Sequence, residues 1–371
     1  MKMIDTIRLA YDTKTIPEEF KISKSKKGVF SGIINPTKEM KASGKYYPRV
    51  TFVKRPVGYG RICQQILIEF SIPKLLKSNN FSEVCDADFD DVVQALKSAL
   101  FDMGIKWQFT ACIENYKVVK VDYSKNIIFD DGTTVSQIIR LFNAANISKR
   151  MDASAGEYRN GGQIFRIHTN YRDIVFYDKI ADLKRSRVSE KRCIEKDNFV
   201  QTSLFDFFEK KRRIAVLRFE VRLNGVKEIK SNLEKVGQNT DDLTFKKMFS
   251  SEISKAVLLN WWEEIFNKIP KTPLDDKTTA NVLIGLLKNK DAKPQKVLAS
   301  IGLLHLQNDK NLDSRFIKEI FDKRFTDGSW NRVVKAQLKP EESKNIRYLL
   351  YIKTIIQEMK PVNIDDYRDD F

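Results

Sequence analysis

The hydrophobic periodicity of this 371-residue chain changes at about residue 240. Before that point, apolar and polar residues alternate in several short segments, which is typical of half-buried β-strands. After it, apolar residues recur at helical spacing and strand patterns end. We therefore expect an α+β fold, with an antiparallel sheet that has helices on one face and an all-helical C-terminal region after it. The predicted domains are residues 1–239 and residues 240–371, the second being a candidate for DNA binding.

Strands and helices are mixed in the first of these regions. Alternation predicts strands over residues 5–12, 47–56, 116–129 and 213–225, a strand that runs into a turn over 61–76, and a β-hairpin within 158–182. Helical spacing predicts helices over residues 86–105, 133–146, 204–211 and 226–237. No internal repeat is visible in the sequence.

The charge balance favours a polyanionic partner. Lys and Arg number 66 against 49 Asp and Glu, a net charge of +17, and nucleic acid is the commonest partner of such a protein. A generally lysine-rich composition is the alternative explanation. Four widely separated cysteines without a CxxC pair speak against a zinc finger and fit a reducing compartment. No apolar run approaches the roughly 18 residues of a membrane span, so we expect a cytoplasmic protein with no membrane partner.

Three of the predicted strands have one apolar and one polar face. Residues i and i+2 share a face of a strand, so every second side chain points the same way. If the three strands are neighbours in one sheet, their polar side chains converge over one patch. These side chains are Asp122 in the strand over 116–129, Tyr177 and Lys179 in the strand over 171–179, and Arg218, Glu220 and Arg222 in the strand over 213–225.

The polar patch suggests phosphodiester chemistry. Two carboxylates, Asp122 and Glu220, are able to hold Mg²⁺ or Mn²⁺, which prefer oxygen ligands. The metal would polarise a phosphodiester and help a tyrosine phenolate to form, while Arg218 and Arg222 hold the DNA backbone. The other interpretation is a half-exposed sheet without function, in which Glu220 forms an ordinary ion pair with its arginine neighbours.

These segments carry a resemblance to a known family. The chain resembles the filamentous-phage gene II/gene X replication initiators, which are rolling-circle nicking-joining endonucleases. Each motif is short, and the specificity lies in their order and approximate spacing across most of the chain. The motifs are MIDTIRLAYD at 3–12, VVKVDYS at 118–124, DIVFYDK at 173–179, LRFEVRL at 217–223 and GSWNRVV at 328–334.

The resemblance assigns roles to three residues. It implies that Tyr177, in a strand that continues to Lys179, makes the covalent link to DNA. It also implies that Asp122 and Glu220 are the metal ligands. Many other rolling-circle initiators bind metal through a His-hydrophobic-His pair, and this chain has only two histidines, far apart in the sequence. His168, in the predicted hairpin turn, is either a further ligand or base or simply a solvated side chain.

The function that follows is initiation of rolling-circle DNA replication. Tyr177 would nick one strand at an origin, form a 5′-phosphotyrosyl link, release a 3′-OH primer and later rejoin the strand. The expected partners are origin DNA, double- and single-stranded, and the host sliding clamp and helicase. The alternatives are a non-catalytic DNA-binding regulator of a phage or plasmid, and a relaxase or transposase of similar chemistry. No GxxxxGK[ST] loop is present, which fits chemistry without ATP.

Two segments after the tyrosine strand suggest further contacts. The basic segment 184–192 offers Lys184, Arg185 and Arg187 to flanking DNA, a solvated loop being the alternative. In residues 198–213, a Gln-x-Ser-Leu-Phe string resembles the peptide that bacterial proteins insert into the sliding clamp, and an amphipathic helix on the chain's own sheet is the alternative. The clamp-binding residues of that string are Gln201, Leu204 and Phe205.

Overall fold

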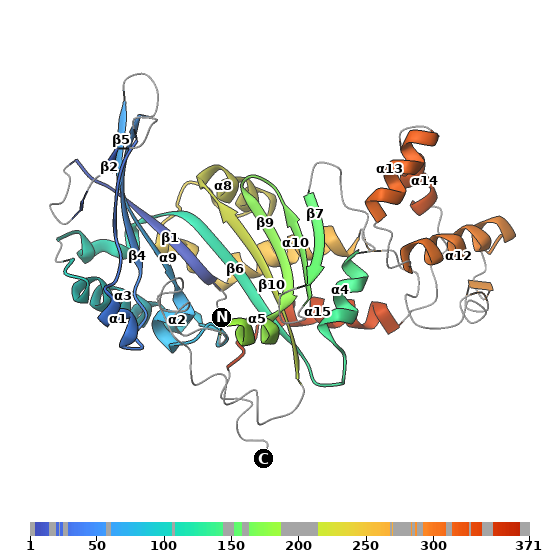
Figure 1. The fold of residues 1–371 in the computed structure, drawn as a ribbon, viewed down its shortest axis with the longest axis horizontal. Helices are drawn as coiled ribbons and strands as arrows, with labels where there is room; N and C mark the ends of the chain where they lie inside the picture. The colour runs from blue at the N-terminus through green and yellow to red at the C-terminus, as the bar shows by residue number, and fades with distance from the viewer. Residues whose placement is uncertain are drawn as a thin grey trace, which may run out of the picture.

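The structure is a computed structural model. It describes residues 4–14, 20–21, 23–24, 29–56, 61–105, 108–143, 152–157, 163–186, 214–267, 269, 283, 286–287, 292–308, 314–325, 328–335 and 344–363. Within these ranges the expected α+β fold is confirmed, with one large antiparallel sheet and a helical C-terminal region (Figure 1).

The sheet has ten strands in the order β2-β3-β4-β5-β1-β6-β10-β9-β8-β7. Figure 1 shows them side by side, from β2 at one end to β7 at the other. All the pairings are antiparallel. The strands are β1 (Ile4–Asp12), β2 (Ser23–Lys24), β3 (Phe30–Ile34), β4 (Arg49–Pro56), β5 (Ile62–Ser71), β6 (Lys117–Phe129), β7 (Asp152–Glu157), β8 (Gln163–His168), β9 (Arg172–Asp178) and β10 (Ala215–Asn224).

The two halves of the sheet share one topology. In each half the first strand, β1 or β6, pairs with the last strand of that half, and the remaining strands follow outwards in reverse order. The two first strands pair with each other at the centre, where Ile7 lies opposite Val121. Ile7 also pairs with Phe70, and Val121 with Leu223. When the two halves are aligned with Ile7 on Val121, each of the ten residues of β5 has an equivalent among the ten residues of β10, from the first residue to the last.

One face of the sheet is covered by helices and forms the main core. The apolar side of α3 (Phe89–Asp102) packs there, as do α4 (Val135–Asn143), α8 (Val226–Lys235), α10 (Ser251–Phe266) and α15 (Lys344–Glu358). Phe176 and Phe219, on neighbouring strands, stack with ring centroids 4.4 Å apart, and Trp262 of α10 meets both edge-on. Such aromatic contacts add about 1 kcal/mol each beyond the area they bury.

The core continues across residue 239, where a domain boundary is predicted. Helices α10 and α15 follow that residue in sequence, yet their apolar residues belong to the same cluster as those of the strands. The small helices α12 (Pro294–Asn308), α13 (Ser314–Arg324) and α14 (Ser329–Lys335) have separate apolar clusters, one of them around the buried Trp330. They lie apart from the sheet in Figure 1.

Shorter helices complete the described fold. The predicted turn at the end of the strand over 61–76 is instead a helix, α2, in which Pro73 occupies the first turn, where proline is favoured. The predicted helix over 204–211 lies outside the described residues. No described helix has the length and apolar content of a membrane span. The shorter helices are α1 (Lys38–Ala42), α2 (Ile72–Lys77), η1 (Asp86–Asp88), η2 (Gln108–Asn115), α5 (Lys179–Ser186) and α9 (Phe245–Met248).

Candidate active site around Tyr177

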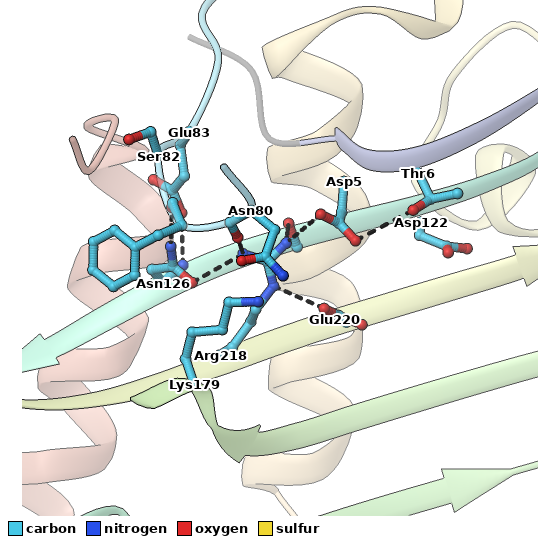
Figure 2. A network of polar contacts seen from close by, with 12 residues as sticks. Asp5, Thr6, Asn80, Ser82, Glu83, Asp122, Asn126, Lys179, Arg218 and Glu220 are labelled. Atoms are coloured by element: carbon cyan, nitrogen blue, oxygen red, sulfur yellow. Dashed lines mark hydrogen bonds and ion pairs between the residues drawn. The ribbon is translucent and has the colours of Figure 1, made fainter. Parts of the chain in front are cut away.

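The three strands with polar faces are neighbours in the sheet, in the order β6-β10-β9. Arg218 of β10 lies opposite Tyr177 of β9, and Arg222 of β10 lies opposite Asp122 of β6. The polar side chains therefore converge on the face of the sheet opposite the main core, as the alternation in the sequence predicts. Figure 2 shows Asp122, Arg218 and Glu220 of this group, with contributions from β1, from residues 80–83 and from Lys179 at the start of α5.

Glu220 is the centre of this group. Its Oε1 atom accepts hydrogen bonds from the Tyr177 hydroxyl at 2.8 Å and from Arg218 Nε at 2.7 Å. Its Oε2 atom accepts from Arg222 Nε at 2.8 Å and from a second nitrogen of the same guanidinium. Glu220 is only 2% exposed, so both carboxylate oxygens are satisfied without water.

Arg218 is buried below Glu220 and is held from several sides. Its guanidinium donates to Ser124 Oγ at 3.0 Å and to Asn126 Oδ1 at 3.2 Å, both on β6, and to the Asn80 carbonyl at 3.3 Å. It also forms an ion pair with Asp5 Oδ1 at 2.8 Å. Because Arg218 is 1% exposed, its role in this structure is to fix Glu220. It does not present a charge to DNA.

Lys179 lies next to the tyrosine at the first position of α5. Its side chain is 2% exposed, its Nζ atom is 5.8 Å from the centroid of the Tyr177 ring, and its ion-pair partner Asp182 is at 3.6 Å. Burial and the nearby Arg218 charge lower the pKa of Lys179 to about 8. A neutral amine is therefore accessible near physiological pH, unlike at an ordinary lysine.

The pKa of the tyrosine moves in the opposite direction. Burial and the negative charge of Glu220 raise the pKa of Tyr177 well above its usual value. Burial also opposes ionisation of Glu220, but the charges of Arg222, Arg218 and Lys179 outweigh it and hold the pKa of that carboxyl well below its usual range. The resting site therefore contains a neutral phenol that donates to a carboxylate.

A polar pocket opens beside these residues. It has a volume of about 370 Å³ and lies over β1, β9 and β10. Its lining combines the tyrosine, both signs of charge and several neutral hydrogen-bonding groups, which suits a charged, hydrogen-bonding ligand. The lining residues are Asp5, Thr6, Ser71, Lys74, Asn80, Tyr177, Lys179, Asp182, Glu220 and Arg222.

The predicted metal ligands are close to each other but do not form a complete site. Asp122 is buried, its Oδ1 atom has no hydrogen-bond partner, and burial raises its pKa to about 7 despite the nearby Lys120 and Arg222. Glu220, by contrast, has both oxygens engaged. No three His, Cys, Asp or Glu residues are grouped to hold an ion in the part of the chain that the structure describes. The Asp122–Glu220 pair in this conformation does not fit Mg²⁺ or Mn²⁺, which need several free oxygens.

His168 does not belong to the site. It lies opposite Asp173, whose carboxylate contacts both His168 Nδ1 and the guanidinium of Arg166, whereas Tyr177 lies opposite Ile164 at the other end of the same ladder. The interpretation as a further ligand or base therefore fails, and the solvated side chain is the better description. Its side chain is 46% exposed.

Other predicted contact residues have different positions. Arg222 lines the pocket with a side chain that is 35% exposed, so it is able to meet a ligand. Lys184 and Arg185 are in α5, but the structure does not describe their side chains. The remaining predicted residues lie outside the described ranges. They are Arg187 of the basic segment and the clamp-binding Gln201, Leu204 and Phe205.

Sequence reasoning missed several groups that complete the site, among them two that hold Arg218. Asp5 is part of the MIDTIRLAYD motif and pairs with Arg218, but its role depends on the long-range pairing of β1 with β6. Asn80 is in no motif, and it reaches Arg218 through a backbone carbonyl. An acidic residue at the start of a predicted strand was a visible signal for the first, and no local signal existed for the second.

Comparisons with known proteins add little to this geometry. No family model matches the chain, and no curated protein matches it. One solved structure, described as the di-domain ARO/CYC BexL from the BE-7585A biosynthetic pathway, is 10% identical and covers 71% of this chain and 84% of its own, with a TM-score of 0.15. A likeness this weak supports no conclusion about fold or function.

Proposed function

We propose that this chain is a rolling-circle DNA replication initiator of the gene II/gene X kind, acting in the cytoplasm of a bacterial host. The observation that carries the proposal is the position of the Tyr177 hydroxyl. It is oriented by Glu220 and lines a polar pocket that also contains Lys179 and Arg222. Transfer of a phosphodiester to a phenol requires a nucleophilic hydroxyl, a proton acceptor and a positive charge near the phosphate. The pocket supplies them as a tyrosine, an amine of lowered pKa and a guanidinium.

The proposed nicking step uses these residues directly. The Tyr177 oxygen attacks the phosphorus of a backbone phosphodiester, the phosphorus–O3′ bond breaks, and a 5′-phosphotyrosyl link and a free 3′-OH result. The phenol proton passes to the neutral amine of Lys179, and the resulting ammonium returns it to the departing 3′ oxygen. Lys74 and Arg222 line the pocket and balance the phosphate charge. Attack by a 3′-OH on the phosphotyrosine reverses the step and rejoins the strand.

Glu220 has an orienting role in this scheme. Its carboxylate accepts the phenol hydrogen bond, but the two arginines hold its pKa too low for it to be an effective proton acceptor near neutral pH. Lys179, with a pKa of about 8, is better matched to that task.

Dependence on Mg²⁺ or Mn²⁺ stays a prediction. The free Oδ1 atom of Asp122 is the acceptor that the predicted ligand pair still offers. Nicking should be measured with each metal and with excess chelator, in the wild-type protein and in Asp122→Asn. A metal requirement that the variant shifts to higher concentration supports Asp122 as a ligand. Full activity in chelator removes the metal from the proposal.

The decisive experiment looks for the covalent adduct. Supercoiled DNA that carries a candidate origin is incubated with the full chain, and the products are separated on a denaturing gel and mapped by mass spectrometry. The expected result is nicked DNA with its 5′ end attached to Tyr177. Sequence-specific binding without any nick would indicate the non-catalytic regulator instead, and an adduct at the exposed Tyr171 would overturn the assignment of the nucleophile.

Binding of the host clamp and helicase is a further part of the proposal, tested by titrating each with the full chain.

A further inference from the structure

Residues 360–363, which follow α15, form a short segment that we name the C-terminal strap. It lies against residues 79–83, which follow α2, more than 270 residues away in sequence. The backbone N–H of Glu83 donates to the Val362 carbonyl at 2.9 Å, and the Val362 N–H donates to Glu83 Oε2 at 2.8 Å. Ser82 Oγ donates to Asn363 Oδ1 at 3.0 Å.

A buried ion pair connects the strap to the sheet. Lys125 of β6 is fully buried, and its Nζ atom donates to Glu83 Oε2 at 2.8 Å and to the Lys360 carbonyl at 2.9 Å. Glu83 Oε1 accepts the backbone N–H of Asn126 at 2.6 Å. Glu83 therefore holds strand β6 through one oxygen and both Lys125 and the strap through the other.

The turn formed by residues 79–83 also reaches the candidate active site. The Phe81 carbonyl accepts from the Asn126 side chain at 2.7 Å, and the Asn80 carbonyl accepts from Arg218. Asn126 Oδ1 accepts from Arg218 as well. Two of the contacts that fix Arg218 thus depend on this turn, and Figure 2 shows the path from Glu83 through Asn126 to Arg218.

An apolar contact runs alongside the polar path. Phe81 is fully buried against Val216 of β10, and Ile180 and Val362 pack on this pair. Ile180 directly follows Lys179, so the strap contacts the same small cluster that seats the start of α5.

We infer that the C-terminal strap and Glu83 are positioning elements of the Tyr177 site, because they hold the 79–83 turn that fixes Arg218, which in turn fixes Glu220 and the phenol. This inference rests on the proposed function for its catalytic readout. It assigns to the end of the helical region a role in the geometry of the site, in addition to its contribution to the core.

The variant that tests it is Glu83→Gln in the full chain, compared with Glu228→Gln. Glu228 of α8 forms an ion pair with Arg172, at the end of β9 away from Tyr177, at 2.5 Å, so its loss controls for general destabilisation. Glu83→Gln should lower kcat for nicking by about tenfold or more with KM within about twofold, because misplacement of reacting groups affects the chemical step. Glu228→Gln should leave kcat unchanged when both are assayed well below their unfolding temperatures.

A second readout does not depend on nicking. The pKa of Lys179 is measured by pH-dependent amine labelling and mass spectrometry. The charged groups that act on it are Arg218, which lowers its pKa along with burial, and Asp182, Asp5 and Glu220, which raise it. Release of Arg218 in Glu83→Gln should shift the Lys179 pKa from about 8 towards 10.5, while Glu228→Gln should not.

The outcomes separate the two proposals. If the wild-type protein nicks no DNA, the proposed function fails, and the Lys179 pKa still decides the inference. An unchanged Lys179 pKa in Glu83→Gln overturns the inference whether or not DNA is nicked. A kcat of Glu83→Gln that equals the kcat of Glu228→Gln also overturns it. If Glu83→Gln fails to fold, Ser82→Ala, which removes the bond to Asn363, is measured in the same two ways with the same criteria.

Discussion

The two halves of the sheet have the same strand order but very different polar faces. The halves are aligned by taking Ile7 as the equivalent of Val121. In this alignment Val53 occupies the position of Tyr177, and Leu67 occupies the position of Glu220. Arg8 and Glu69 pair where the second half has Asp122 and Arg222, with the charges exchanged. A common topology thus supplies two equivalent surfaces, and only the second carries the proposed nucleophile, Tyr177. The fold alone therefore does not specify the chemistry.

The difference extends to burial. In the first half, the Arg8 and Glu69 side chains are 38% and 23% exposed, whereas Arg218 and Glu220 are each 2% exposed. The exposed pair adds little to stability because water screens it. The buried group depends on complete pairing, since an unpaired charge there is strongly destabilising. Variants in the first half therefore provide controls for variants in the second.

The largest expected effect is on the nucleophile. Tyr177→Phe should reduce nicking by at least about 10³-fold, because only the reacting oxygen is removed. Val53→Ala, at the corresponding position of the first half, should remain within about twofold of the wild-type rate. Both are measured as initial rates of nicking on the same DNA, with binding followed separately. Normal nicking by Tyr177→Phe would break the distinction between the halves.

The next effect is on the free energy of unfolding. Glu220→Gln should lower it by about 3 kcal/mol, because Arg218 and Arg222 lose their shared counter-charge in a buried site. Glu69→Gln should lower it by about 1 kcal/mol or less, because its partners remain partly solvated. Urea denaturation at neutral pH measures both. Equal losses in the two variants would show that the buried cluster is no more tightly coupled than the exposed pair.

The last effect is a pH dependence of stability. The pKa of Lys179 is lower in the folded chain, about 8, than in the unfolded one, near 10.5. The unfolded state binds more protons between these values, so this group makes the wild-type protein more stable as pH rises through that window, by roughly 3 kcal/mol in total. Lys179→Met should be more stable than wild type at pH 7 and should lose that advantage near pH 10.5.

Arg55 of β4, at the position corresponding to Lys179, provides the control. Arg55→Met should differ from wild type by a constant amount across the same pH range, because Arg55 is exposed and an arginine stays protonated throughout it. Thermal unfolding at several pH values compares the two variants. A flat difference for Lys179→Met as well would mean that its amine is not perturbed by burial.

Local pattern was sufficient to predict the strands and faces of the site. Because alternate side chains of a strand point to the same face, Arg218, Glu220 and Arg222 share one face of their strand wherever that strand lies. Asp122 and Tyr177 are likewise placed on the polar faces of their own strands. Which strands become neighbours is a separate question that alternation leaves open. The structure answers it by placing β6, β10 and β9 side by side.

Long-range contacts account for most of what the sequence did not reveal. Helical spacing predicted α10 and α15 as helices but not that they pack on the sheet, because an amphipathic face does not identify its partner. The 79–83 turn meets Arg218 through backbone carbonyls, which carry no residue-specific signal. The repeated strand order is likewise hidden, since the corresponding positions hold chemically different residues.

The central position of β1 has a consequence for protein synthesis. This strand is translated before the other described strands of the sheet, yet it pairs with β5, about 60 residues later, and with β6, more than 100 residues later. Until residues 117–129 leave the ribosome, a nascent chain that has formed the β1–β5 pair exposes one edge of β1. Unpaired edges invite association with other chains, and charged residues discourage it. Arg8 lies between the buried Ile7 and Leu9 of β1, so we expect its charge to discourage association of the growing chain during translation.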